Sequence, residues 1–249
     1  MKKVFMMAGM ALLSAGAFAQ TNIQLFYDLG QDRKMVTSTL EMFKSDDWGS
    51  TFFFVDYDYF SNKFRNEEYM GVKPNKNIYG ASGSYFEIAR SINFWQDSQL
   101  GALSAHVEFN AGVGFTTRNW LIGAEYFMHS DDFANTLTLE LMYKTFSPNS
   151  ESHLPLQFTA VWGMNNIFGV EGLNFSGFAD LWGEDGPYAD KSKREKSLTF
   201  ISEPQLWYNV GSLFNCPNFN VGGEVEISSN FAGNQGLMVN PCLGVKWAF

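Results

Sequence analysis

The chain has 249 residues, of which 45% are hydrophobic, 17% aromatic and 17% charged. A water-soluble domain usually carries about 25% charged residues, so this chain is poor in charge and rich in rings. Its abundant apolar area excludes an intrinsically disordered protein, and its net charge of −9 argues against nucleic acid as a partner. Beyond the first 20 residues the longest purely apolar run is Phe52–Val55, far below the roughly 18 residues of a spanning helix. A helical membrane protein is therefore also excluded.

The first 19 residues have the pattern of a secretory signal peptide. Lys2 and Lys3 form a basic start, Val4–Leu13 is apolar, and Ala17-Phe18-Ala19 is a small-x-small cleavage site. A short membrane anchor is the alternative, but the apolar run is too short to span a bilayer. We expect cleavage near Ala19, which leaves residues 20–249 as one domain with 15 basic and 26 acidic residues and a net charge of −11.

Apolar and polar residues alternate with a period of two along the whole mature chain. In 102–113, for example, Leu103 and Val107 alternate with His106 and Glu108. Such alternation predicts two-faced β-strands. We expect twelve strands, at about 22–29, 35–43, 50–60, 79–91, 101–114, 118–129, 133–146, 154–165, 171–183, 197–210, 218–230 and 236–249.

The connections between these segments alternate in length. Loops at 61–78 and 184–196 are long and polar, whereas turns near 44–48 and 130–132 are short. This asymmetry is typical of outer-membrane barrels. A β-sandwich and a lipocalin-like barrel are the soluble alternatives, but they need a densely charged outer face. The polar face here is a sparse mixture of acidic and small residues with rings, which suits a narrow lumen better.

Aromatic residues sort by strand end on the face predicted to meet lipid. One girdle contains Tyr57, Tyr59, Trp120 and Tyr143, and the other contains Trp162, Tyr208, Trp247 and Phe249. Tyr and Trp favour membrane interfaces because one end is apolar and the other forms hydrogen bonds. The sequence therefore predicts an all-β fold, a transmembrane up-and-down antiparallel β-barrel of 12 strands that contacts outer-membrane lipid.

Several stretches resemble the Tsx-like nucleoside-channel superfamily, within which the similarity is to a branch of uncharacterised outer-membrane proteins. They are Phe26-Tyr27-Asp28, Trp48-Gly49-Ser50-Thr51-Phe52-Phe53-Phe54-Val55-Asp56, Phe86-Glu87-Ile88-Ala89-Arg90, Phe175-Ser176-Gly177-Phe178-Ala179-Asp180 and Gly223-Glu224-Val225-Glu226-Ile227. The resemblance covers nearly all of the mature chain and implies a monomeric barrel that passes nucleosides. The last strand, which ends in Phe249, resembles the signal that directs barrels to their assembly machinery in the outer membrane of Gram-negative bacteria.

The side chains expected to line a channel combine rings with carboxylates, as nucleoside binding requires. The predicted lining residues are Phe52, Phe54, Asp56, Asp58, Glu87, Arg90, His106, Glu108, Glu125, Glu140, Asp180, Trp182, Glu203, Trp207, Glu224 and Glu226. Alternatively, the interior is a plug in which Lys144, Arg90 and Lys246 pair with the carboxylates. Glu87 and Arg90 have opposite parity, so either a bulge intervenes, as the resemblance favours, or Arg90 reaches the headgroups. We also expect a bulge or bend at Pro204 and at Pro241.

Enzymatic, metal and disulfide chemistry find little support in the sequence. None of His106, His129 and His153 shares a lipid-facing site with a serine, and no zinc-ligand spacing or phosphate loop is present. We therefore expect no catalytic residues, cofactor or metal. Strand register places Cys242 opposite Glu224 or Val225, too far from Cys216 for a disulfide. The main hypothesis is a passive channel for small solutes, most plausibly nucleosides. The alternatives are a non-conducting structural or surface-interaction barrel that uses the loops at 61–78 and 184–196, and a barrel lipid hydrolase.

Overall fold

The structure is a computed structural model, and it describes residues 20–30, 34–59, 83–113, 118–146, 151–185, 196–232 and 234–249. These residues form one closed antiparallel sheet in which strands β1 to β9 each pair with the next, β10 and β11 both pair with β9 and β12, and β13 pairs with β12 and closes on β1. The elements are β1 (Gln20–Asp28), β2 (Val36–Asp46), β3 (Gly49–Tyr59), β4 (Gly83–Ile92), β5 (Leu103–Val113), β6 (Arg118–His129), β7 (Asn135–Lys144), β8 (Leu156–Met164), η1 (Ile167–Gly169), β9 (Leu173–Asp185), β10 (Lys196–Ser202), β11 (Gln205–Asn209), η3 (Gly211–Phe214), β12 (Phe219–Ser229) and β13 (Leu237–Ala248).

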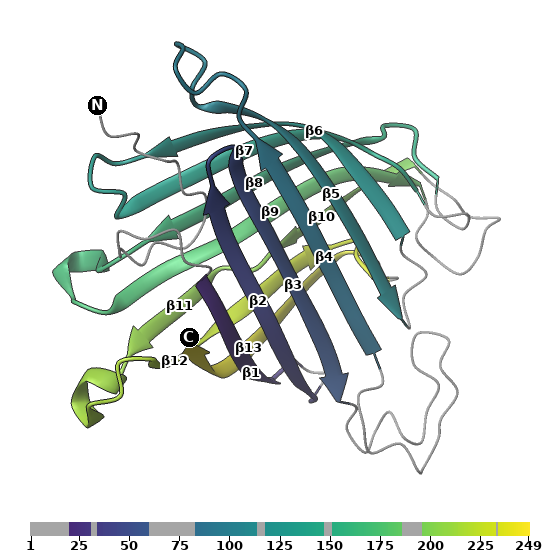
Figure 1. Cartoon of the computed structure of the whole chain (residues 1–249). Coiled ribbons are helices and arrows are strands. Elements are labelled where there is room, and N and C mark those ends of the chain that lie inside the picture. The colour runs from purple at the N-terminus through teal and green to yellow at the C-terminus, as the bar shows by residue number, and fades with distance from the viewer. Residues whose placement is uncertain are drawn as a thin grey trace.

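β10 and β11 are two halves of one barrel strand, because both pair with β9 on one side and with β12 on the other. The barrel therefore has twelve strands, as predicted. Figure 1 shows β2–β4 in front, sloping across β12 and β13 that lie behind them in this view, and this tilt of the strands is what closure of a barrel requires. Among the described residues there is no helix of the length and apolarity needed to cross a membrane.

The barrel is inverted in polarity relative to a soluble domain. In β1, Gln24 and Asp28 are buried inside, whereas Ile23 and Leu25 are 46% and 50% exposed on the outside. The same alternation recurs in β6 and β7, where Glu125 and Glu140 are buried. Antiparallel partners share a face, so the polar faces of successive strands form one continuous interior. The prediction that the apolar face points outward is confirmed.

The predicted girdle rings are also on the outer face. The exposed members are Tyr57, Tyr59, Trp120, Tyr143, Trp247 and Phe249. Trp162 and Tyr208 are half-buried, and Trp162 packs against Phe175, with 6.0 Å between ring centroids. An exterior of this kind needs an apolar surrounding, because exposing a broad band of aliphatic and aromatic side chains to water is unfavourable.

Pro204 interrupts the strand without a bulge. Ser202 pairs with Ala179 and Ile227, and Gln205 pairs with Ser176 and Glu224. All three strands advance by the same number of residues, so no extra residue is inserted. Pairing stops at Pro204 because proline has no N–H. Of the two distortions expected at this position, a bulge or a bend, the bulge is absent, and the strand is interrupted instead.

Pro241 lies within an unbroken β13, in continuous register with β12. Its carbonyl accepts the Leu29 N–H, so the nitrogen of Pro241 faces the same side, beyond Asp28, the last residue of β1. The missing N–H therefore faces Leu29, one residue beyond the end of β1. No hydrogen bond between the paired residues of β1 and β13 is lost. Of the bulge or bend expected at Pro241, the bulge is therefore absent.

The predicted shortness of alternate connections holds for the β2–β3 and β6–β7 turns, but not for all connections at the same end of the barrel. The β4–β5 connection spans 93–102, and the β8–β9 and β11–β12 connections contain η1 and η3. In the first, the Asn93 side chain donates to Gly101 O and accepts from the Trp95 N–H, at 2.5 and 2.8 Å. These longer connections are stabilised by their own hydrogen bonds.

Cys216 and Cys242 form no disulfide, and Cys242 pairs with Glu224 as expected. Cys216 lies in the connection after η3. The register between β12 and β13 thus agrees with the hairpin that the sequence predicted.

Candidate functional site in the barrel interior

Strand pairing places nearly all predicted lining residues on the inner face. They are Phe52, Phe54, Asp56 and Asp58 on β3, Glu87 on β4, His106 and Glu108 on β5, Glu125 on β6, Glu140 on β7, Asp180 and Trp182 on β9, Trp207 on β11, and Glu224 and Glu226 on β12. Their alternation with exposed apolar residues fixes this assignment. Whether they conduct a solute is a separate question.

Arg90 is not part of the interior. β4 pairs with β3 and β5 in unbroken register, with Arg90 opposite Thr51 and Val107 on the outer face. Its guanidinium donates to both oxygens of Asp46, at 2.6 and 2.9 Å, and to Thr51 Oγ1. The predicted bulge was wrong. Asp46, the partner of Arg90, is the last residue of β2 and also lies on the outer face, so Arg90 reaches it without distortion of β4.

Glu203 belongs to no strand. It lies in the interruption before Pro204, where its backbone N–H donates to Phe178 O. Gly177 on β9 lies beside this break with a φ of 153°, and a Cβ there would come within 2.5 Å of the Glu203 carbonyl oxygen. A glycine at position 177 therefore lets the interrupted strand approach β9.

A polar network around His106 packs the wall formed by β4–β7. Glu125 Oε2 accepts from Ser91 Oγ at 2.6 Å and lies 3.1 Å from His106 Nδ1. Ser91, His106 and Glu125 are each at most 6% exposed. The serine that contacts the imidazole is Ser91, with 3.2 Å between Ser91 Oγ and His106 Nδ1. Ser91 Oγ and His106 Nδ1 therefore share one oxygen of the Glu125 carboxylate, which links β4, β5 and β6.

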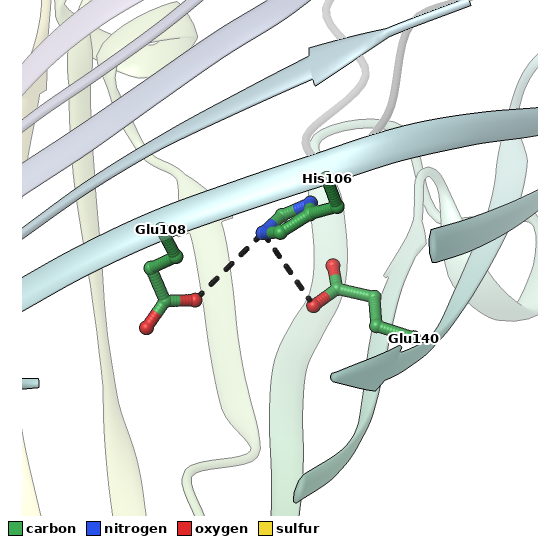
Figure 2. Close-up of side chains that lie close together, drawn as sticks. All are labelled: His106, Glu108 and Glu140. Carbon is green, nitrogen blue, oxygen red and sulfur yellow. Dashed lines mark ion pairs between the residues drawn. The ribbon is translucent and has the colours of Figure 1, made fainter. Parts of the chain in front are cut away.

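The other nitrogen of His106 faces two carboxylates. His106 Nε2 lies 3.8 Å from Glu108 Oε2 and 4.0 Å from Glu140 Oε2 (Figure 2). Both distances exceed a hydrogen bond, and Nε2 has no hydrogen-bond partner. The three ligand atoms all lie within 4.8 Å of one another. This is the group of described side chains whose spacing could accommodate a metal ion.

Lys144 and Trp182 continue the packed wall toward β9. Lys144 Nζ donates to Gln157 Oε1 at 2.8 Å and lies 3.8 Å from the centre of the Trp182 ring. Trp182 Nε1 donates to Glu184, and the side chain is 6% exposed. The Trp182 ring is already covered by a cation, so it offers no open face to a solute.

A second ring pair is closed in the same way. Trp207 packs against Phe26 with 5.6 Å between ring centroids, and Lys246 Nζ lies 4.2 Å from the Trp207 ring. A Cβ on Gly222 would come within 2.8 Å of the Trp207 ring, and one on Gly244 within 2.6 Å of Phe26. Glycine at both positions gives the two rings room to lie against the wall, where Trp207 is 1% exposed.

The wall formed by β3 and β4 is more open. Phe54 packs against Phe52 and Tyr85, with centroid distances of 5.9 and 5.7 Å, and all three side chains are half-buried. Beside them, Asp56 accepts from Thr39 at 2.6 Å and Asp58 accepts from Thr37 at 2.8 Å. Rings with free area and ordered carboxylates therefore lie together on this wall.

Sequence reasoning missed several interior residues that complete these sites. They are Phe26, Thr39, Tyr85, Ser91 and Gln157. Strand parity was a sufficient signal for each of them, because every one has at least one apolar outer-face neighbour in its strand. Tyr85, for example, has the same parity as Glu87, to which it donates a hydrogen bond at 3.3 Å.

Solved structures with the same fold include porins and other outer-membrane channels. NanC porin matches with a TM-score of 0.53 and 8% identity over 91% of this chain and 98% of that chain. KdgM porin in complex with disordered oligogalacturonate matches with 0.48 and 11% over 92% and 99%, and an outer membrane channel from Pseudomonas putida F1 with 0.44 and 10% over 96% and 97%. At such identities the likeness shows the fold alone.

Comparison of the sequence with families gives one match. Residues 19–249 match the family described as "Domain of unknown function (DUF5020)". A search of the curated proteins finds no match.

Proposed function

This chain belongs to the DUF5020 family, whose domain is of unknown function, and we propose that it is a passive outer-membrane channel for small hydrophilic solutes. The single observation that carries the proposal is the inverted barrel, with a polar interior enclosed by an apolar exterior. Such an architecture is stable in a bilayer because every backbone group is paired within the closed sheet. The likeness of the fold to NanC porin supports it.

The proposal includes export and insertion into the outer membrane of a Gram-negative bacterium. The signal peptide and its cleavage near Ala19 concern residues that lie outside the described part of the chain. Phe249 is 72% exposed, and its N–H donates to Thr21 O at the closing pair of strands. We expect the protein to act as a monomer, with β13 as the segment that the barrel-assembly machinery recognises.

Nucleosides are the proposed permeants, on the basis of the open β3–β4 wall and the Tsx-like resemblance. Base–aromatic stacking contributes about 1 to 3 kcal/mol per base, and the rings with available area are Phe52, Phe54 and Tyr85. Carboxylates of Asp56 and Asp58 can accept hydrogen bonds from ribose hydroxyls. Trp182 and Trp207 are omitted from this binding surface because lysines cover them.

Solute flux into liposomes that contain the folded barrel tests both parts of the proposal. We expect uptake of adenosine and uridine, and saturation at lower concentration than for ribose, which lacks a base. Phe54→Leu should raise the nucleoside concentration that half-saturates the flux about fivefold or more, because one stacking ring is lost. Phe53→Leu is the matched control, because Phe53 is the adjacent ring on the outer face.

The outcomes separate the two levels of the proposal. Equal behaviour of nucleosides and ribose would reject nucleoside selectivity but keep a channel. A folded barrel that passes neither solutes nor ions would reject the channel itself.

A non-conducting barrel is the second candidate, and the packed β4–β7 wall favours it. Buried and mutually satisfied polar groups such as Ser91, His106 and Glu125 also occur in barrels that serve as scaffolds. The loops that such a role would use, 61–78 and most of 184–196, lie outside the described residues. The lipid-hydrolase alternative gains no support at His129, where the adjacent Ser130 hydroxyl donates to Asp132.

A further inference from the structure

We propose that His106, Glu108 and Glu140 form a binding site for one divalent transition-metal ion inside the barrel. The inference goes beyond the proposed channel and does not depend on it. It rests on three observations: the spacing of the ligand atoms, the unpartnered imidazole nitrogen that faces the carboxylates, and the charge of the surrounding wall.

The spacing of the three ligand atoms suits a metal ion better than direct contact. His106 Nε2 lies 3.8 Å from Glu108 Oε2 and 4.0 Å from Glu140 Oε2, and no two ligand atoms are more than 4.8 Å apart. A circle through points with these separations has a radius of about 2.0 to 2.5 Å. Zn–N and Zn–O bonds are about 2.0 to 2.2 Å, so closing of the carboxylates by a few tenths of an ångström completes the bonds.

The imidazole is oriented as a metal ligand would be. Nδ1 lies 3.1 Å from Glu125 Oε2. In the tautomer whose Nδ1–H donates to that carboxylate, Nε2 carries a lone pair directed at Glu108 and Glu140. A metal-binding histidine usually donates its other N–H to a carboxylate or carbonyl in this way. Ser91 Oγ donates to the same oxygen of Glu125 at 2.6 Å and holds it in place. Nε2 has no other partner, although His106 is 6% exposed.

Direct contact does not close the gap around His106 Nε2. Nε2–H would have to bond across 3.8 and 4.0 Å, beyond hydrogen-bond range. A cation between the groups would occupy the gap and satisfy all three.

The surrounding wall is strongly acidic. Glu87, Glu108 and Asp180 act electrostatically on Glu140 and on one another, and Glu125 lies opposite Glu140 in the β6–β7 pair. Lys144 faces the same group with one positive charge. A divalent cation would offset the repulsion among these carboxylates, which Lys144 cannot balance alone. Burial strengthens the attraction between the cation and the carboxylates.

The ligand types select the class of metal. Imidazole nitrogen suits Zn²⁺ and neighbouring first-row ions, whereas Mg²⁺ and Ca²⁺ favour all-oxygen sites. With three protein ligands, a tetrahedral ion would retain one position for water or solute.

The proposal is tested by titrating the folded, chelator-treated barrel in detergent with Co²⁺ and Zn²⁺. We expect one ion per chain, visible d–d absorption of Co²⁺ in a low-coordinate site, and its loss when Zn²⁺ competes. Glu140→Gln should weaken binding at least tenfold. Glu125→Gln removes the positioning carboxylate and should weaken binding about 10- to 100-fold, with one ion still bound at saturation.

Surface histidines provide the matched control. The double variant His129→Gln/His153→Gln leaves His106 as the one histidine of the chain and should bind as the wild type does, whereas His106→Gln should not bind. Circular dichroism establishes that each variant is folded; if His106→Gln does not fold, Glu140→Gln decides. Absence of binding to the folded wild type would overturn the proposal, as would an unchanged affinity in Glu140→Gln or loss of binding in the double variant. Because no transport is measured, failure here leaves the channel proposal untouched.

Discussion

Two walls of the same barrel interior differ in how far their polar side chains are buried and bonded to one another. On the β4–β7 wall, Ser91, His106 and Glu125 are buried and bonded to one another. On the β3–β4 wall, Phe54 and Asp56 are half-buried and keep free area toward the lumen. The difference teaches that strand alternation assigns side chains to the inside, but contact between neighbouring strands decides which of them remain open to a solute.

The largest expected effect is on the stability of the packed wall. Lys144→Met keeps the length of the side chain but removes the charge that faces Asp180 and Glu108 and the bond to Gln157. Breaking a buried charged network costs about 3 to 5 kcal/mol, and we expect such a loss in the free energy of unfolding. Urea unfolding in lipid vesicles, followed by tryptophan fluorescence, measures it.

Lys44→Met is the matched control for that experiment. Lys44 is exposed on the outer face near the end of β2, and its replacement should change stability by about 0.5 kcal/mol or less. Equal losses in the two variants would show that the β4–β7 wall is no more tightly coupled than the surface.

A smaller effect is expected on ion selectivity through the open wall. Asp56→Asn removes a half-buried negative charge that acts on Glu224 across the interior. A unit charge at about 4 Å in water contributes about 1 kcal/mol, so the permeability ratio of cations to anions should fall by up to about fivefold. Reversal potentials in a KCl gradient measure this ratio. Glu171→Gln, in the exposed β8–β9 connection, should leave it unchanged; a similar fall there would contradict a luminal role for Asp56.

The smallest effect is expected outside both walls. Arg90→Gln breaks a partly exposed ion pair with Asp46, which typically contributes about 0 to 1 kcal/mol. Ion selectivity should not change, because Arg90 lies on the outer face. A shift of the reversal potential in this variant would return Arg90 to the lumen and reject the assigned β4 orientation.

Much of the fold could be predicted from the sequence because side-chain alternation in a strand is local. His106 and Glu108 share a face as soon as their segment is a strand, and the outer rings follow from the same parity. Arg90 shows the limit of this reasoning. Its parity was known, but the resemblance favoured a bulge, and Asp46, its true partner, is 44 residues away in the chain. Pro204 likewise predicted a disturbance but not its form.

The sequence by itself determined which side chains point inward and which point outward, because a period of two depends only on each strand. Tertiary structure decided the rest. The register of β5, β6 and β7 brings Glu125 and Glu140 to His106, and neither parity nor composition contains that register. Closure of β13 on β1 also brings Phe26 onto Trp207. Packing between strands that are distant in sequence therefore decided which inward rings were covered and which carboxylates met.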